Sequence, residues 1–339
     1  MQLSVLNTER LSSGYRKRAI DLQSKKILLT KFRGSQQEQD FAEPSNCDGF
    51  GRIRHFRRRD DNWPDNPLPI DPAFSALGLA HSDEIRAQVF QNAVCNWRCW
   101  YCFVDFDLLS ANPKFAAWKS ADELVDLYLS EKDAPPVIDL TGGQPDLTPE
   151  WIPWMMRALC QSRLDNSVYL WSDDNLSNDY FWKYLTSSDR DTICSYRNYG
   201  RVCCFKGFDE ESFAFNTSAH PDLFEQQFEL FKRLLSLGID LYGYVTLTCP
   251  STHKLQIRIR QFVDKLQAIH SMLPLRIVPL QIRVFTPVMS RLDEARRLSV
   301  EFQMDVMNVW NEELDRRFDG RVRRARIDAT SLNMRSSRV

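Results

Sequence analysis

The sequence predicts an α/β fold: a partial (β/α)6 barrel of the TIM type, with an N-terminal extension and a C-terminal helical segment. Apolar runs rich in β-branched residues alternate along the chain with helical patterns, which is typical of βαβ units and a parallel sheet. Polar or glycine-rich residues follow these runs directly, as at the carboxyl ends of barrel strands. An open doubly wound sheet gives the same alternation, so alternation alone does not separate the two arrangements.

The predicted elements follow one another as pairs of strand and helix. The six predicted strands cover 87–95, 137–142, 167–172, 201–206, 241–248 and 276–285. The predicted helices cover about 120–131, 149–162, 177–187, 222–237, 253–271 and 291–316. Ser120 and Glu123 have the spacing of a capping box at the start of the first helix, and Gly238 ends the helix before the fifth strand.

The chain is expected to have three parts: an irregular N-terminal extension (1–86), a core barrel (87–290) and a C-terminal helix with a basic tail (291–339). The proline-rich stretch 63–72 disfavours helix and indicates extended chain. This extension either lines one mouth of the barrel or covers an apolar edge. The basic run 52–59 alternates enough to be a solvated strand face, and the alternative is a binding surface for an acidic substrate, a nucleic acid or a protein.

The composition is that of an ordinary globular protein. With 339 residues, 43% of them hydrophobic, and a net charge of −1, the chain is not disordered and has no overall charge that favours a polyanion. The run lengths exclude a membrane span and the N-terminus lacks the order of a signal peptide, so a cytoplasmic protein without a membrane partner is expected. Arginines gather in the last twenty residues: Arg321, Arg323, Arg324, Arg326, Arg335 and Arg338.

Three of the nine cysteines lie close together in the sequence, at Cys95, Cys99 and Cys102. In a reducing compartment such a cluster indicates a metal or catalytic site before a disulfide. Three thiolates cannot close a tetrahedral structural zinc site, whereas on a 4Fe–4S cluster they leave one iron open for an exogenous ligand. The alternative is three buried or zinc-binding cysteines.

With Tyr101 before the last cysteine, this spacing resembles the C-x3-C-x-aromatic-C signature of radical S-adenosylmethionine (radical SAM) enzymes. The resemblance covers about residues 87–285 and is nearest to the activating-enzyme-like subgroup. It implies a single 4Fe–4S cluster on Cys95, Cys99 and Cys102, S-adenosyl-L-methionine (SAM) as second cofactor, and an electron donor such as flavodoxin or ferredoxin. The implied reaction is reductive cleavage of SAM followed by abstraction of a hydrogen atom from a substrate.

The loop after the second predicted strand carries Gly142, Gly143 and Gln144. A Gly-Gly pair indicates backbone that approaches something closely or adopts a positive φ. The loop resembles the GGEP-like motif of the family, which implies contact with the amino group of the methionine moiety. Gln144 replaces the acidic residue, so its amide oxygen offers no charge. Standing alone, the pair would indicate only a strand-to-loop turn.

Three further residues at strand ends are candidates for cofactor contacts. Lys206 ends an apolar strand, and the stretch that it begins resembles a KG-x5-F segment whose lysine reaches the cofactor. A surface lysine at a strand end is the alternative. Ser172 and Asp173 follow the third strand, and the alternative is a carboxylate that caps the helix near Leu176.

The sequence leaves the substrate open among a small molecule or nucleotide, a peptide and a partner enzyme. The last ninety residues contain no cysteine array for a second cluster, and the adjacent Cys203 and Cys204 must point to opposite faces of a strand. A single cluster is therefore expected. The alternative function is a non-catalytic iron–sulfur or zinc protein with a basic surface that binds nucleic acid or protein.

Overall fold

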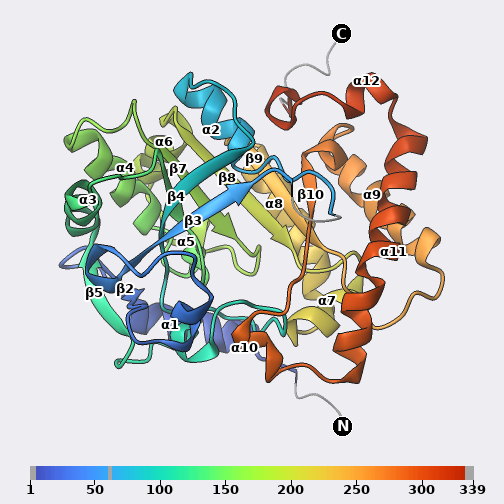
Figure 1. The fold of residues 1–339 in the computed structure, drawn as a ribbon, viewed down its shortest axis with the longest axis horizontal. Helices are drawn as coiled ribbons and strands as arrows, with labels where there is room; N and C mark the ends of the chain where they lie inside the picture. The colour runs from blue at the N-terminus through green and yellow to red at the C-terminus, as the bar shows by residue number, and fades with distance from the viewer. Residues whose placement is uncertain (1–4, 60–62, 333–339) are drawn as a thin grey trace.

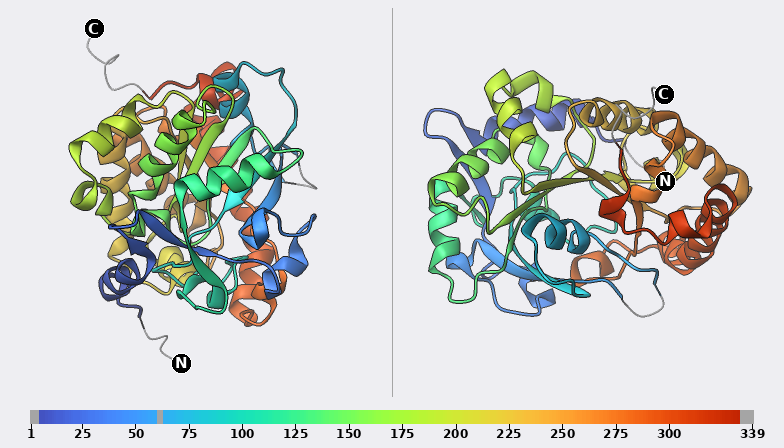
Figure 2. Two further views of the ribbon diagram at one scale, coloured as in Figure 1. Left: turned by 90° about the vertical axis from the view of Figure 1, so that its left-hand side faces the viewer. Right: turned by 90° about the horizontal axis from the view of Figure 1, so that it is seen from above.

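The computed structural model describes residues 5–59 and 63–332, and its centre is a curled sheet (Figures 1 and 2). Its strands are β3 (Gly51–Arg57), β4 (Glu84–Phe90), β6 (Val137–Leu140), β7 (Tyr169–Asp174), β8 (Tyr199–Phe205), β9 (Leu241–Thr246) and β10 (Ile277–Leu280). The spatial order is β10-β9-β8-β7-β6-β4-β3. All neighbours from β4 to β10 are parallel, and each strand joins the same side of the one before it. A doubly wound sheet would reverse this order, so the fold is the partial barrel that the sequence predicts.

Helices cover the convex face of the sheet. They are α3 (Ala121–Ser130), α4 (Trp151–Gln161), α5 (Tyr180–Tyr184), α6 (Ser187–Ser195), α7 (Glu210–Thr217), α8 (Leu223–Leu235), α9 (Leu255–Ile269) and α11 (Glu294–Arg317). The predicted capping box of α3 is confirmed: the Glu123 N–H donates to Ser120 Oγ at 3.1 Å, and the Ser120 N–H donates to Glu123 Oε2 at 2.7 Å. The predicted helix 177–187 is the shorter α5, because a separate helix, α6, begins at a capping box that Thr186 forms, and α7 is an additional helix.

Two predicted strands run five residues past the observed ends, at Phe90 and Leu280. The strand predicted at 87–95 leaves the sheet after Phe90, because Asn92 bridges to Leu29 of the smaller sheet instead. The strand predicted at 276–285 ends at Leu280, and the next backbone N–H groups turn to side chains, as Ile282 does to Gln303 Oε1 at 2.9 Å. Both chain segments therefore leave the barrel at its carboxyl end, near the cysteine loop.

The concave face has its own core, formed by every second residue of each strand. Val137, Trp171, Cys204 and Tyr244 belong to it, whereas the neighbouring Cys203 packs on the convex side. The expected division of Cys203 and Cys204 between the two faces is therefore confirmed. At the amino ends of the strands, α2 (Ile70–Leu77) packs its apolar residues against this inner core.

The N-terminal region is more regular than the irregular extension that the sequence predicts. It contains α1 (Thr8–Ala19), β1 (Ile20–Asp21), β2 (Lys26–Thr30), the short helices η1 (Gln36–Asp40) and η2 (Cys47–Gly49), β3 and α2. The strand β2 pairs with β5 (Ala116–Ser120) in a three-stranded sheet. Pro72 is compatible with α2 because it lies in the first turn, where its missing N–H has no helical partner to lose. The boundaries of the three parts stay predictions.

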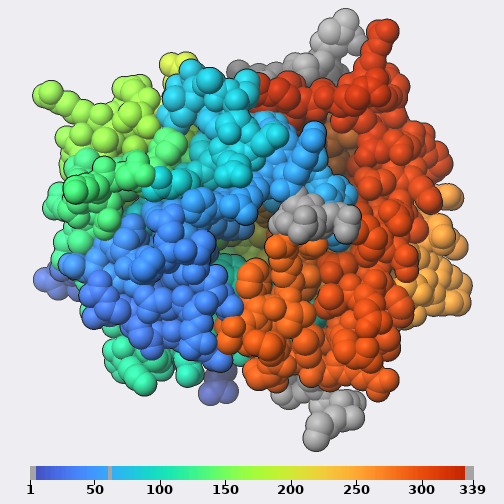
Figure 3. All heavy atoms as spheres, in the orientation of Figure 1, coloured from blue at the N-terminus to red at the C-terminus, as the bar shows by residue number. Residues whose placement is uncertain are grey.

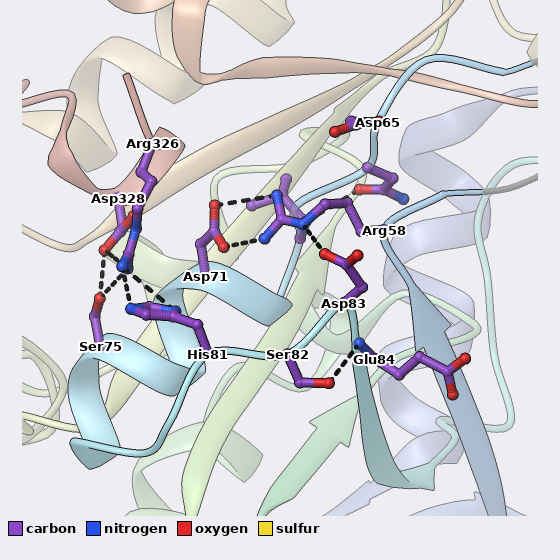
Figure 4. A network of polar contacts seen from close by, with 12 residues as sticks. Arg58, Asp65, Asp71, Ser75, His81, Ser82, Asp83, Glu84, Arg326 and Asp328 are labelled. Carbon is purple, nitrogen blue, oxygen red and sulfur yellow. Dashed lines mark hydrogen bonds and ion pairs between the residues drawn. The ribbon is translucent and has the colours of Figure 1, made fainter. Parts of the chain in front are cut away.

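Polar contacts join α2 to Arg58, which follows β3, and to the C-terminal region (Figure 4). The Arg58 guanidinium forms ion pairs with Asp71 of α2 and with Asp83, at 3.0 Å in the latter case. From the C-terminal region, Arg326 contacts Ser75 of α2 and pairs with Asp328 at 2.6 Å. The segment that follows α11 contains α12 (Gly320–Arg323) and η6 (Ile327–Ala329).

Two further predictions concern the arginines of the C-terminal tail and the absence of a membrane span. Arg335 and Arg338 lie outside the described residues. In the described part of the chain, no helix combines the length and the apolar character that crossing a membrane requires.

Candidate functional site

The cysteine loop lies at the carboxyl ends of the parallel strands, between β4 and β5. Its backbone is bound to neighbouring segments: the Cys95 N–H donates to the Leu109 carbonyl at 3.1 Å, and the Trp100 N–H donates to the Asn216 carbonyl at 3.2 Å. The Trp100 indole N–H also donates to Asn216 Oδ1 at 3.1 Å. This network joins the loop to the segment before β5 and to the end of α7.

The three thiols are free and share one electrostatic environment. Cys99 is buried, and Cys95 and Cys102 are half-buried. Burial raises the pKa of Cys99 to about 12; Lys206 lowers it, and the neighbouring thiols Cys102 and Cys95 raise it further. Burial and Cys95 likewise raise the pKa of Cys102. Added positive charge, such as a metal centre supplies, would hold Cys99 and Cys102 as thiolates at neutral pH.

The donor set distinguishes between a single ion and a cluster. Within the described ranges, no three His, Cys, Asp or Glu side chains are grouped as ligands of one metal ion. A 4Fe–4S cluster takes one thiolate on each of three irons, so its ligands stand further apart than those of a tetrahedral zinc ion. Three free thiols that lie in one loop and influence each other's ionisation are compatible with a cluster.

The two glycines after β6 lie against the segment that leads into the cysteine loop. Gly142 and Gly143 have positive φ values of 80° and 65°. A Cβ on Gly142 would lie 2.4 Å from Gln91 Oε1, and one on Gly143 would lie 2.4 Å from the Asn92 carbonyl oxygen and 2.6 Å from that of Val94. Both the unusual conformation and the close approach are therefore present, and the atoms approached belong to the protein itself.

Gln144 is buried, and both ends of its amide have partners in the protein. Its Nε2 donates to Asp174 Oδ1 at 2.8 Å, and its Oε1 accepts the Asn175 N–H at 2.9 Å. Asp174 and Asp146 both pair with the buried guanidinium of Arg201. A glutamate at 144 would add a third carboxylate to two that share one arginine, which gives a physical reason for glutamine here. Contact of Gln144 with a cofactor stays a prediction.

The structure separates Ser172 from the other candidates. Its hydroxyl shares a hydrogen bond of 2.7 Å with the Tyr199 hydroxyl, among residues of the convex face. Asp173 is the next residue and therefore points to the concave side. There its carboxylate accepts a hydrogen bond from Thr141. Burial raises the pKa of Asp173, and the Thr141 hydrogen bond and nearby cations lower it.

Lys206 points into the barrel. Burial lowers the pKa of its ammonium, but the acidic groups around it, Cys204, Tyr101, Cys99 and Asp173, together raise it well above its usual value. The Tyr101 hydroxyl shares a hydrogen bond of 2.9 Å with Thr246 Oγ1 of β9. Four predicted site residues, Cys99, Tyr101, Asp173 and Lys206, thus influence one another at the carboxyl end of the barrel.

Sequence reasoning missed three charged residues on the concave face. Arg52 and Arg54 lie on β3, within the basic run for which the sequence favours a solvated face and leaves a binding surface as the alternative, and Asp139 lies on β6. Arg52 is 8% exposed and Asp139 is 0% exposed, whereas Arg59 of the same run has a side chain 76% exposed. The basic run is therefore buried at one end and solvated at the other. No local pattern distinguishes the two ends, because antiparallel pairing of β3 with β4 turns Arg52 and Arg54 inward.

Comparisons with known proteins give distant structural similarity only. No protein-family model matches the chain, and no curated protein matches it. Among solved structures, Streptococcus suis SuiB bound to S-adenosylmethionine has a TM-score of 0.43 and 15% identity, over 65% of this chain and 47% of that one. SuiB bound to its precursor peptide SuiA has a TM-score of 0.38 and 16% identity, over 61% and 45%. The chain thus spans less than half the length of these structures that it resembles.

Proposed function

We propose that this protein is a radical SAM enzyme that cleaves SAM reductively and removes a hydrogen atom from a substrate. The observation that carries the proposal is the position of the C-x3-C-x2-C loop at the carboxyl end of a parallel half-barrel, with Lys206 and Tyr101 turned toward its cysteines. Carboxyl ends of barrel strands are where active sites form. A purely structural role for these thiols would not need a lysine inside the barrel.

Cys95, Cys99 and Cys102 would hold the cluster. Bound there, it would supply the electron for reductive cleavage of SAM. The chain's own part begins with ionisation: the Lys206 ammonium stabilises the Cys99 thiolate, because it lowers the pKa of that thiol. The hydrogen bond between Tyr101 and Thr246 fixes the end of the cysteine loop against β9.

The inner core of the barrel protects a reactive intermediate from water. Trp171, Tyr242 and Val202 are buried on the concave face, and α2 closes the amino end beneath them. Cys204 is the inward thiol nearest to Lys206 along β8, and burial raises its pKa to about 12. It therefore stays protonated, with its S–H bond available inside the barrel. An enclosed apolar site prevents side reactions of the kind that a radical would undergo in water.

The electron must come from outside the chain in this proposal. The remaining cysteines are dispersed between both faces of the sheet, the surface and the N-terminal region: Cys47, Cys160, Cys194, Cys203, Cys204 and Cys249. A small redox protein of the flavodoxin or ferredoxin type in a reducing cytoplasm would supply it. The single cluster expected from the sequence is part of the same proposal.

Anaerobic assay of the reconstituted full chain tests the function. After incubation with iron, sulfide, SAM and dithionite, we expect 5′-deoxyadenosine to form, as measured by mass spectrometry. Cys99→Ala should abolish it, whereas Cys160→Ala, at an exposed cysteine of α4, should not. A wild-type protein that binds about four irons yet never forms 5′-deoxyadenosine would contradict the proposal and favour a non-catalytic iron–sulfur protein.

A further inference from the structure

Arg52 and Asp139 lie at one level of the concave face. Arg52 of β3 is opposite Val89 of β4, and Val89 is opposite Asp139 of β6. The two charged side chains thus flank one small apolar residue, with Arg54 one pair nearer the amino end of the parallel strands. The Arg54 Nη1 atom is 3.7 Å from Asp139 Oδ2, which is close enough to offset charge but too far for a hydrogen bond.

Both groups are buried and have polar atoms without hydrogen-bond partners. Among the described residues, neither Nε nor Nη2 of Arg52 has a partner, and neither carboxylate oxygen of Asp139 has one. Buried charged groups are normally paired and hydrogen-bonded, since a buried polar atom without a partner is costly. The two residues therefore present two unused donors and two unused acceptors to the same interior.

Two aromatic rings lie beside the Arg52 guanidinium. Its central carbon lies 5.3 Å from the ring centroid of Phe41 and 5.2 Å from that of Phe103, which directly follows Cys102. The unpartnered Nε and Nη2 atoms form one edge of the guanidinium, and two N–H donors on one edge match both oxygens of a carboxylate. Figure 3 shows this side of the molecule hollowed between the N-terminal segment, in blue, and the segment after β10, in orange.

We propose that Arg52 and Asp139 recognise an α-amino-acid group, with the carboxylate on the Arg52 edge and the ammonium on Asp139. Two donors set opposite two acceptors are complementary to a zwitterion, which brings no net charge into the barrel. A simple anion would use the arginine and leave both oxygens of Asp139 without a hydrogen bond. The inference rests on the proposed function for the source of this group, which is either the methionine moiety of SAM or the substrate itself.

Paired ligands that differ only in the carboxylate distinguish the two sources. The cofactor pair is SAM and its decarboxylated form, S-adenosylmethioninamine. The substrate pair is each of the twenty common amino acids and its amide, measured with and without SAM. Affinities are measured by calorimetry on the full-length, cluster-loaded protein and on three variants: Arg52→Met, Asp139→Asn and, as a control on the exposed part of the same strand, Arg57→Met.

We expect one pair to show at least a tenfold preference for the carboxylate ligand in the wild type and in Arg57→Met. Arg52→Met should abolish this preference, because the variant loses the donor edge but keeps an apolar stem between the two rings. Asp139→Asn should weaken both members of the pair alike. Dependence in the SAM pair assigns the group to the cofactor, and dependence in an amino-acid pair assigns it to the substrate; both outcomes support the site.

The same preference in Arg52→Met as in the wild type, or no carboxylate preference in any pair, overturns the inference. If Arg52→Met does not fold, Arg52→Lys serves instead, since it keeps the charge but lacks the two-donor edge. The experiment distinguishes failure of this inference from failure of the proposed function. A protein that makes 5′-deoxyadenosine but shows no role for Arg52 refutes only this inference, whereas amino-acid binding through Arg52 without SAM cleavage refutes only the proposed function.

Discussion

The backbone N–H of Gln144 donates to the carbonyl oxygen of Val94 at 2.8 Å, so the loop after β6 is joined to the cysteine loop one residue before Cys95. Gly143 lies against the same carbonyl. The two motifs that the sequence carries far apart are therefore one structural unit. Any change that separates the loop after β6 from Val94 should also disturb the position of the Cys95 thiol.

Gly143→Ala should destabilise the protein more than its backbone conformation alone explains. Its φ of +65° makes any side chain unfavourable by about 1–2 kcal/mol. The added Cβ would also lie 2.4 Å from one carbonyl oxygen and 2.6 Å from another, and backbone cannot yield as a flexible side chain does. We expect a total loss of about 3 kcal/mol or more in the free energy of unfolding measured with urea.

Gly78→Ala is the matched control for this prediction. Gly78 has a φ of +64°, almost the same as Gly143, but a Cβ there meets no other atom of the described residues within 4 Å. Gly78→Ala should therefore lose only the part of the unfolding free energy that comes from the backbone conformation. Equal losses for the two variants would mean that the contact with the cysteine loop is unimportant.

The half-barrel itself could be predicted from the sequence because its strands are apolar runs with polar residues at their ends. The face of the sheet to which each side chain points could not be predicted in the same way. A strand buried on both faces is a continuous apolar run, so nothing in 169–174 indicates that Ser172 points outward and Asp173 inward. The structure settles it through the hydrogen bond that the hydroxyls of Ser172 and Tyr199 share.

The charged interior could not be predicted either, because it depends on pairing between distant segments. A basic run such as 52–59 is normally solvated, and only its antiparallel pairing with β4 brings Arg52 and Arg54 to Asp139. Similarly, the partners of the Gln144 amide lie on the next strand, at Asp174 and Asn175. The motif identifies the loop, but the contacts come from the fold.

Gln144→Glu should destabilise the folded protein above about pH 5. The new carboxylate would face Asp174, and the donated hydrogen bond of 2.8 Å would be lost. Removal of one partner from a buried hydrogen bond costs about 1–3 kcal/mol, and like charge adds to it. Gln144→Met, which has similar size and no charge, should lose only the hydrogen-bond part in urea unfolding. If the glutamate variant were as stable as wild type and bound SAM more tightly, Gln144 would instead contact the cofactor as the sequence motif implies.

Replacement of any one of Cys95, Cys99 and Cys102 by alanine should remove most of the bound iron. The wild type should bind about four irons per chain after anaerobic reconstitution, measured by iron quantitation and Mössbauer spectroscopy. Cys204→Ala tests the inner barrel separately: it should keep the cluster, because Cys204 lies on β8 and not in the loop. About eight irons in two distinct clusters would contradict the single-cluster expectation, and full iron content in the triple variant would contradict the ligand assignment.

Arg58→Met should loosen α2 from the amino end of the barrel. The Arg58 side chain is 19% exposed and pairs with Asp71, which is 3% exposed, so the substitution leaves a buried carboxylate without its ion pair. Loss of one partner from a fully buried pair costs about 3–5 kcal/mol, and the partial exposure of Arg58 lowers this cost. The neighbouring Arg59→Met is the control, since the side chains of Arg59 and Asp65 are 76% and 54% exposed and an exposed pair contributes little. Equal thermal stability of the two variants would mean that α2 is held by its apolar face alone.

Because the folded protein must give up the proton on Asp146, its free energy of unfolding should fall as the pH rises from about 4 to about 7. Burial raises the pKa of Asp146 to about 7; Arg201 lowers it, and the neighbouring carboxylates Asp174 and Glu150 raise it. An aspartate in the unfolded chain titrates near about 3.9, so between these values the folded state holds a proton that the unfolded state has released. Stability from this group is complete below about pH 4, decreases through this window and is constant above it.

Asp146→Asn removes the titrating group and isolates this contribution. The difference in unfolding free energy between wild type and variant, measured with urea at pH 5 and pH 8, should shift against the wild type by about 2 kcal/mol at the higher pH. Asp126→Asn, on the exposed face of α3, controls for the loss of one negative charge. A difference that instead moves in favour of the wild type as the pH rises would mean that Asp146 is ionised throughout, with its charge held by Arg201.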